Sequence, residues 1–170
     1  PASTEVEGRE LVAITQAGIT TPGVMAIKEK LEGLSFEVIA FHCNGIGGQA
    51  MEELILDGVI KGIIDFSPHE IIDLLYDGLM PAMPGRLEAA GKMGSPQIVT
   101  PGATDIRLHG RPDELPEEVA GRACAQHTPT HTHVRSSAEE MAAVARFTAE
   151  RLNAAHGPRA VLIPLHGFSM

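Results

Sequence analysis

The sequence has no tryptophan and few other aromatic side chains, with five phenylalanines and one tyrosine among 170 residues. Its hydrophobic content, 44% of the chain, is therefore mostly aliphatic. Aliphatic side chains suit helices packed on a sheet better than an aromatic-rich β-sandwich. A chain of this length buries roughly 70% of its unfolded surface, so a single core can form without disulfides or structural metal.

Cysteine and clustered positive charge are also scarce. The two cysteines, Cys43 and Cys124, lack CxxC spacing, so we expect reduced thiols. Thirteen basic residues stand against twenty-two acidic ones, and no two Lys or Arg residues are adjacent, which argues against a nucleic-acid partner. Apolar runs are short and interrupted, which predicts neither a membrane span nor a signal peptide. We therefore expect a cytoplasmic protein.

Short apolar strands alternate with helical segments along the chain. This alternation is typical of a mostly parallel sheet with helices on both faces. The sequence predicts one doubly wound, Rossmann-like α/β domain over residues 1–170, with a polar excursion at 107–122 and an extended segment at 128–134. The expected strands are 10–15, 36–41, 60–66, 96–100 and 160–164, and the expected helices are 22–34, 49–59, 68–76, 86–93 and 136–155.

Two Ser-x-x-Glu patterns predict capped helix starts. Ser67 stands three residues before Glu70, and Ser136 stands three residues before Glu139. In such a capping box each side chain bonds the backbone of the other residue. For Ser67 this structural role is the alternative to a place in a ligand site.

The chain begins at Pro1 and stops at Met170 soon after an apolar strand, as a fragment of a longer polypeptide would. We expect the C-terminal domain of a two-domain protein. A bare apolar edge strand needs cover. A homo-oligomer is therefore expected, and a role in domain packing or dimerisation, without a ligand, is one functional hypothesis.

Polar residues and glycines follow four of the expected strands. The carboxyl ends of parallel strands meet at one edge of a sheet, and ligands bind in the crevice there. The sequence therefore predicts a binding site for a small anionic or phosphorylated ligand at this edge. Its candidate ligand-binding residues are Thr20 and Thr21 after the first strand, Gly45, Gly47 and Gly48 after the second, Ser67 after the third, and Pro101, Gly102 and Asp105 after the fourth.

The glycine turn before the second helix is the main reason to expect an anion. Glycine lets backbone amides approach a ligand closely at a positively polarised helix start. The turn is neither GxGxxG nor a Walker loop, since no lysine precedes the helix, so the cofactor stays unknown. The alternative is a tight turn that needs glycine for geometry alone.

A third hypothesis is acid–base catalysis by a hydrolase or lyase. Asp65 ends a run of isoleucines, and His42 follows the second strand, so these residues and His127 are the candidate catalytic groups. For Asp65 the alternative is a carboxylate that braces a loop. His166 also stands at a strand end.

A histidine cluster near the end of the polar excursion raises the question of a metal. His131 and His133 share one face of an extended segment, and His127 can join them, with Cys124 nearby. No HExxH or CxxC pattern accompanies them, so no metal is predicted. The alternative is a half-exposed threonine and histidine strand.

Several motifs together resemble one family, from about residue 10 onward. The sequence resembles the second domain of a microbial family that is related to the plant tobamovirus-resistance protein. The motifs are Ile19-Thr20-Thr21-Pro22, His42 to Glu52 with its glycine turn, Arg86-Leu87-Glu88, Pro96 to Asp105, and Val161 to Leu165.

The resemblance implies a Rossmann-like domain preceded by an N-terminal ATP-binding domain, which would be its partner in the same polypeptide. The plant member inhibits viral RNA replication by binding the viral replication protein. The family's motif positions fall on Gly45, Gly47, Gly48, Asp65, Arg86, Glu88, Pro101, Gly102, Asp105, His127, Thr130 and Arg135, which adds Arg86 to the candidate ligand-binding residues. The sequence departs from the family at Ile46, His131, His133 and His166.

Overall fold

The computed structural model describes residues 8–169, which form two β-sheets. The larger sheet is parallel, with the strand order β2-β1-β3-β4-β8. This order reverses at β1, the doubly wound arrangement, so the expected fold class is confirmed. Its strands are β1 (Leu11–Gln16), β2 (Glu37–His42), β3 (Gly62–Asp65), β4 (Gln97–Val99) and β8 (Arg159–Val161).

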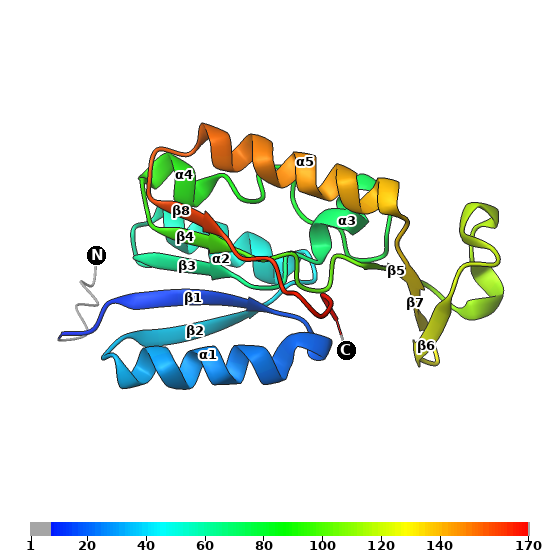
Figure 1. The fold of residues 1–170 in the computed structure, drawn as a ribbon, viewed down its shortest axis with the longest axis horizontal. Helices are drawn as coiled ribbons and strands as arrows, with labels where there is room; N and C mark the ends of the chain where they lie inside the picture. Colours follow the sequence, from blue (N-terminus) through cyan, green and yellow to red (C-terminus); the bar gives the residue numbers. More distant parts are fainter. Residues whose placement is uncertain (1–7, 170) are drawn as a thin grey trace.

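Helices cover both faces of the parallel sheet, with α1 on one face and the others opposite (Figure 1). Successive side chains of β1 point to opposite faces. Ile14 packs with Val24 of α1, whereas Ala13 packs with Met51 and Ile55 of α2. The helices are α1 (Thr21–Gly33), α2 (Ile46–Leu56), α3 (Glu70–Leu75), α4 (Ala89–Met93) and α5 (Ala138–Ala154). None of the helices within residues 8–169 has the length and apolarity needed to cross a membrane.

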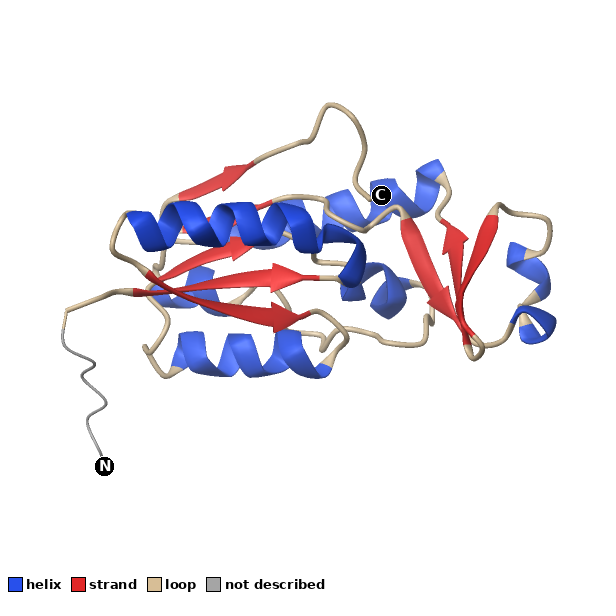
Figure 2. Ribbon diagram, turned by 90° about the horizontal axis from the view of Figure 1, so that it is seen from below, coloured by secondary structure: helices blue, strands red, loops and turns tan. Residues whose placement is uncertain are grey.

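A small antiparallel sheet is inserted between β4 and α5, in the order β5-β7-β6. Its strands are β5 (Ile106–His109), β6 (Cys124–Thr128) and β7 (His131–Arg135). The parallel strands point their carboxyl ends toward it (Figures 1 and 2). The expected polar excursion is therefore one strand of this sheet followed by two 3-10 turns, Pro112–Glu114 and Glu117–Val119.

A buried arginine fastens the small sheet to the rest of the molecule. Arg107 of β5 is fully buried and donates to Glu140 of α5 at 2.8 Å and to the Tyr76 carbonyl. Glu140 also accepts a bond from Arg122 at 2.7 Å. The histidines of β6 and β7 are thereby held beside the parallel sheet.

Both capping predictions were wrong. The α5 helix is capped one residue later than expected, because Ser137 accepts from the Glu140 amide at 3.1 Å, while Ser136 bonds the Thr104 carbonyl. Ser67 caps no helix. Its amide donates to Thr15 Oγ1 at 2.9 Å, and its hydroxyl lies 2.6 Å from that of Thr20, so it links the ends of β1 and β3.

The three glycines at the start of α2, Gly45, Gly47 and Gly48, have no room for a side chain of their own. A Cβ atom at Gly47 would lie 1.9 Å from the His42 carbonyl oxygen, and one at Gly48 would lie 1.8 Å from Glu70 Oε1. Gly45 adopts a φ of 87°, a conformation that favours glycine. Geometry alone is thus a sufficient reason for these glycines.

We predict that Gly47→Ala and Gly48→Ala each lower the free energy of unfolding by about 1–3 kcal/mol, because each methyl group overpacks its site. Gly33→Ala is the matched control, since nothing lies within 4 Å of a Cβ at that helix end. Urea unfolding measures all three. Equal stability of the three variants would contradict the prediction.

Candidate functional site

A cavity of about 160 Å³ lies between the carboxyl ends of β1 and β2 and the small sheet. Five histidines line it, namely His42, His69, His127, His131 and His133. They come from three separated segments of the chain, so only the tertiary fold brings them together. We call this cavity the histidine crevice.

The segments that lead into α1 and α2 also line the histidine crevice. Gly18 and Ile19, in the 3-10 turn Gly18–Thr20 that leads into α1, line it, and so does Asn44, two residues before α2. The first amides of a helix have no partner within it and attract negative charge. The crevice thus combines imidazoles and the side-chain amide of Asn44 with segments that lie directly before two helices.

The histidine rings are held in defined positions. The His127 and His133 rings stack with centroids 4.5 Å apart. His131 Nδ1 lies 3.0 Å from the Thr128 hydroxyl, and His69 Nδ1 lies 3.0 Å from the Ala103 carbonyl oxygen. Because a carbonyl oxygen only accepts, His69 Nδ1 carries the proton of that bond.

His133 is the histidine whose titration is most altered. Its burial, followed by the neighbouring imidazoles of His127, His69 and His131, lowers the pKa of His133 to about 4. At neutral pH the ring is therefore uncharged. A negative ligand in the crevice would offset both causes and raise this pKa.

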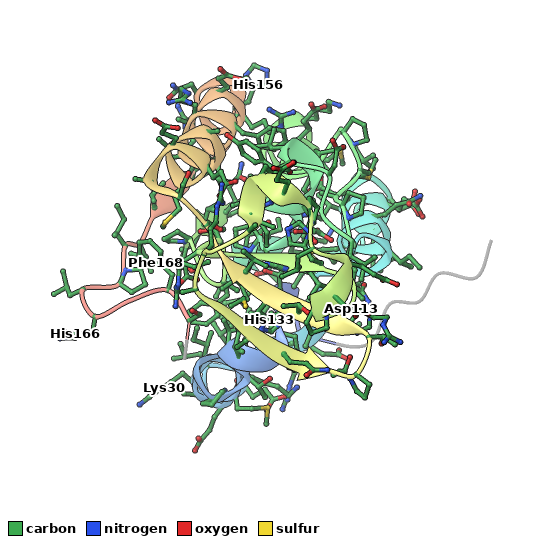
Figure 3. The ribbon with its side chains drawn as sticks, turned by 90° about the vertical axis from the view of Figure 1, so that its right-hand side faces the viewer. Lys30, Asp113, His133, His156, His166 and Phe168 are labelled. Carbon is green, nitrogen blue, oxygen red and sulfur yellow. The ribbon has the colours of Figure 1, made fainter. Side chains whose placement is uncertain are left out.

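A second hollow, of about 250 Å³, continues the crevice around Ile19, which lines both. Thr20 and Gly102 line it, together with C-terminal residues such as Phe168. Figure 3 shows Phe168 near the small sheet, with His166 on an outlying loop away from His133. His166 is thus not part of the histidine crevice.

Arg86 lies in a different place, at the centre of a buried charge cluster. It is fully buried and binds Asp65 through two bonds of 2.6 and 2.8 Å. It also donates to Glu70 at 2.6 Å and to Glu52 at 3.0 Å. The guanidinium faces three carboxylates and has no exposed surface for a ligand.

The glycine turn contributes to this buried cluster. The Gly45 amide, one of those expected to hold an external anion, donates to Glu70 Oε2 at 2.5 Å. Gly48 packs against the same carboxylate. The anion beside this turn in the described structure is therefore a side chain of the protein itself.

Burial shifts the protonation equilibria of the cluster. Desolvation raises the pKa of Glu52, against the lowering effects of Arg86 and of the amides of Ala89 and Leu87. Burial likewise raises the pKa of the Cys43 thiol well above its usual range, so Cys43 stays protonated and is a poor nucleophile.

The remaining candidate residues are dispersed. His42 and His127 line the histidine crevice, whereas Asp65 is not among its lining residues. Asp105 Oδ2 pairs with Arg135 and accepts from Ser169 at 2.8 Å. The structure thus does not gather His42, Asp65 and His127 into one cavity.

The other candidate ligand-binding residues also lie apart from one another. Thr21 begins α1, Pro101 lines a hollow beside α5, and Ser67 is fully buried.

Sequence reasoning missed His69 as a crevice residue and Glu52 and Glu70 as partners of Arg86. The Ser67-x-x-Glu70 pattern indicated a cap, which concealed the role of Glu70 in the charge cluster. No local pattern links Glu52 to an arginine 34 residues away. Within the described residues 8–169, no group of three or more His, Cys, Asp or Glu side chains is arranged to hold a metal ion.

Comparison with known proteins identifies the family of this chain. Residues 9–170 match the model of the Uncharacterised protein family (UPF0261) C-terminal domain. The chain belongs to this family. The resemblance stated from the motifs is thereby confirmed.

Relatives occur in bacteria and in a plant. A UPF0261 protein of Clostridium tetani is 42% identical over 166 residues, covering 97% of this chain and 41% of that protein. One of Rhizobium meliloti is 35% identical, with 97% and 41% covered. The ToMV resistance protein Tm-1(GCR237) of Solanum lycopersicum is 33% identical, with 95% and 22% covered. The chain thus spans less than half the length of these relatives and corresponds to one part of a larger protein.

We predict that Arg86→Leu lowers the free energy of unfolding by about 3–5 kcal/mol, because three buried carboxylates lose their counterion. The control is Arg111→Leu, which removes an exposed pair with Asp113 and should cost less than about 1 kcal/mol. Urea unfolding of both variants measures the difference. Similar losses for the two would contradict the importance of the buried cluster.

A second prediction concerns acid stability. The pKa of His133 is lower in the folded chain than in the unfolded chain, so falling pH from about 6.5 toward 4 protonates the unfolded state first and removes stability. His133→Gln should therefore lose less stability than the parent between about pH 7 and pH 4.5. His156→Gln, an exposed position just after α5, should behave like the parent. Identical pH profiles for all three proteins would refute the role of His133.

Proposed function

We propose that the chain binds a small anionic or phosphorylated ligand in the histidine crevice. The observation that carries the proposal is the convergence of five histidines with Asn44, Gly18 and Ile19 on one cavity. A neutral imidazole supplies one hydrogen-bond donor and gains positive charge on protonation. The N–H of neutral His69 is already bonded to the Ala103 carbonyl, so the other four histidines are the donors of the proposed site. A phosphoryl group has three acceptor oxygens for such donors.

The charge pattern around the crevice supports an anion rather than a cation. Asp65, Glu52 and Glu70 are turned toward Arg86 within the core. Asp105 is engaged with Arg135. No Asp or Glu is among the residues that line the histidine crevice. Asp73 lies behind the lining, with Oδ2 4.0 Å from His69 Nε2. A bound anion would therefore meet donors with no carboxylate among the lining residues.

The ligand-binding residues in this proposal are His42, Asn44, His127, His131 and His133, with Thr20 and Gly102 in the adjoining hollow. Arg86, Gly45 and Gly48 do not contact the ligand in this proposal. Their cluster supports the site, because it fixes the end of β2 and the start of α2. The N-terminal ATP-binding domain implied by the resemblance is the proposed partner in the same polypeptide. The free thiols of Cys43 and Cys124 are consistent with the proposed cytoplasmic setting.

Acid–base catalysis is the second candidate, because His42 and His127 line one cavity. In that case one imidazole would accept a proton and another would donate one to a ligand bound between them. Asp65 would act only through Arg86, as part of the support of the site. His127→Gln would then abolish turnover while retaining much of the ligand affinity.

The binding proposal predicts proton-linked affinity. Calorimetry with sulfate, inorganic phosphate and phosphate monoesters should show binding that tightens as pH falls from about 8 to 6, because protonated imidazole is favoured in the complex. Sulfate keeps its charge over this range, so its pH dependence reports the protein alone. His131→Gln and His133→Gln should each weaken binding about tenfold or more.

His156→Gln is the matched control and should bind as the parent does. The longer polypeptide is titrated in parallel, so that a site completed by the other domain is also measured. Binding that no crevice substitution alters, or no binding of any of these anions to either protein, would defeat the proposal.

A further inference from the structure

The outer edge of β8 is an open sheet edge beside exposed apolar residues. Only β4 pairs with β8 within residues 8–169, so β8 ends the sheet. The apolar residues at its end and directly after it are exposed to solvent, with exposed fractions of 53% for Val161, 55% for Leu162 and 67% for Ile163. An open apolar edge strand is a template for another strand, and proteins normally cover it.

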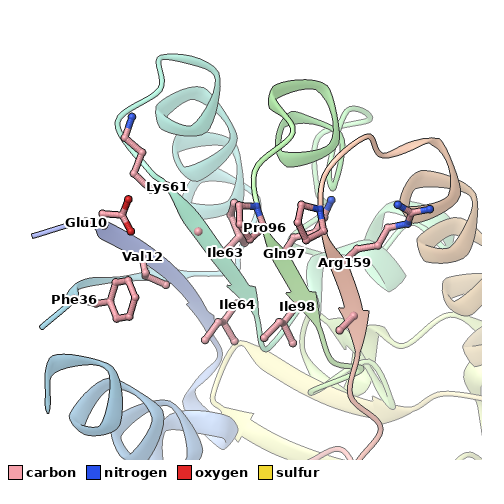
Figure 4. Close-up of a pocket in the computed structure, with 13 residues that line it drawn as sticks. Glu10, Val12, Phe36, Lys61, Ile63, Ile64, Pro96, Gln97, Ile98 and Arg159 are labelled. Atoms are coloured by element: carbon pink, nitrogen blue, oxygen red, sulfur yellow. The ribbon is translucent and has the colours of Figure 1, made fainter. Parts of the chain in front are cut away.

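Hollows flank β8 on both faces. One of about 450 Å³ lies between α5 and the strand and is lined by Ala145, Val161 and Ile163. The other, of about 410 Å³, includes Ile64 and Ile98 on the face that carries α1 (Figure 4). Ala160, the register partner of Ile98, also lines it. Their linings are predominantly apolar, as expected for surfaces that pack against other elements.

The exposed faces conflict with the rule for parallel sheets. Such sheets are buried on both sides, because their strands are apolar on both. The α1 helix packs on β1 and β2, toward the opposite end of the sheet from β8. The strands β4 and β8 are thus left without a helix on that face in residues 8–169. On the opposite face α5 leaves the hollow lined by Ala145, Val161 and Ile163 open.

We propose that a segment of the same polypeptide outside residues 1–170 adds a strand to β8 and lays a helix in the hollow beside α5. The bacterial relatives offer the length for it, since 41% of their chain corresponds to this one. A right-handed crossover from β8 to a strand beyond it brings the connecting helix to the face of α5, as the crossover from β4 to β8 does. The larger hollow lies on that face.

A second copy of the chain fits this surface less well. Two β8 strands related by a twofold axis would pair over only three residues, Arg159 to Val161. The hollow beside α5 is concave and extends beneath that helix, so it needs an inserted element rather than another edge. A helix from the same polypeptide provides that shape at high effective concentration.

Amide hydrogen exchange in the full-length polypeptide tests the proposal. Leu162 donates its amide to Val99 of β4, so the alternate amides of Val161 and Ile163 point to the open edge. We expect these two amides to exchange at least a hundredfold more slowly than in an unstructured peptide, at every protein concentration. Exchange near the unstructured rate would overturn the proposal.

Two further measurements test the origin of slow amide exchange at this edge. They distinguish cover by a segment of the same polypeptide from self-association, and from slow exchange that does not depend on the β8 surface. Protection that disappears on dilution, together with a change of mass in sedimentation, would assign the edge to a second copy and refute the proposal. In the full-length polypeptide, Val161→Asp should remove the protection at Ile163, whereas Leu34→Asp, at an exposed site after α1, should leave it unchanged. Equal protection in both variants would also refute it.

Discussion

The buried ion cluster around Arg86 is the constraint on which the arrangement of this protein depends. One guanidinium joins Asp65 at the end of β3, Glu52 within α2 and Glu70 at the start of α3. Burying three carboxylates is costly, and only the shared cation and the added amide bonds offset the cost. Glu70 in turn binds the Gly45 amide, so the turn that leads from β2 into α2 is fixed by the same charges.

The histidine crevice is a consequence of that fixed turn and of the inserted sheet. His42 and Asn44 sit at the end of β2, directly before the turn, while β6 and β7 supply the facing histidines. Arg107 and its partner Glu140 anchor the insertion to α5. Both walls of the crevice are thus set by buried arginines. Among the residues that the structure describes, His69 is the crevice histidine that lies beside a carboxylate, with Nε2 4.0 Å from Asp73 Oδ2, and the other four imidazoles are available to a ligand.

Much of the architecture could be predicted from local sequence because parallel strands buried on both faces are short apolar runs separated by helices. The separation of two positions between His131 and His133 predicted correctly that they share a face of an extended segment, since both line one cavity. The inserted sheet escaped prediction because β5 is four residues long and contains Arg107 and His109, which read as a polar loop. The prediction of a helix cap at Ser67 was wrong because the Ser67 hydroxyl lies beside the hydroxyl of Thr20, in the segment that follows the neighbouring strand β1.

The sequence by itself determined the fold class, the carboxyl edge as the place where polar residues gather, and the family to which the chain belongs. Only the tertiary structure decided what the charged residues do there. Asp65 was a candidate catalytic group from its place at a strand end, and Arg86 a candidate ligand-binding residue from the family resemblance, yet the fold turns them toward each other in the core. The physical reason is that ion pairing and crevice formation join residues tens of positions apart, and no local pattern records which of several carboxylates an arginine will meet.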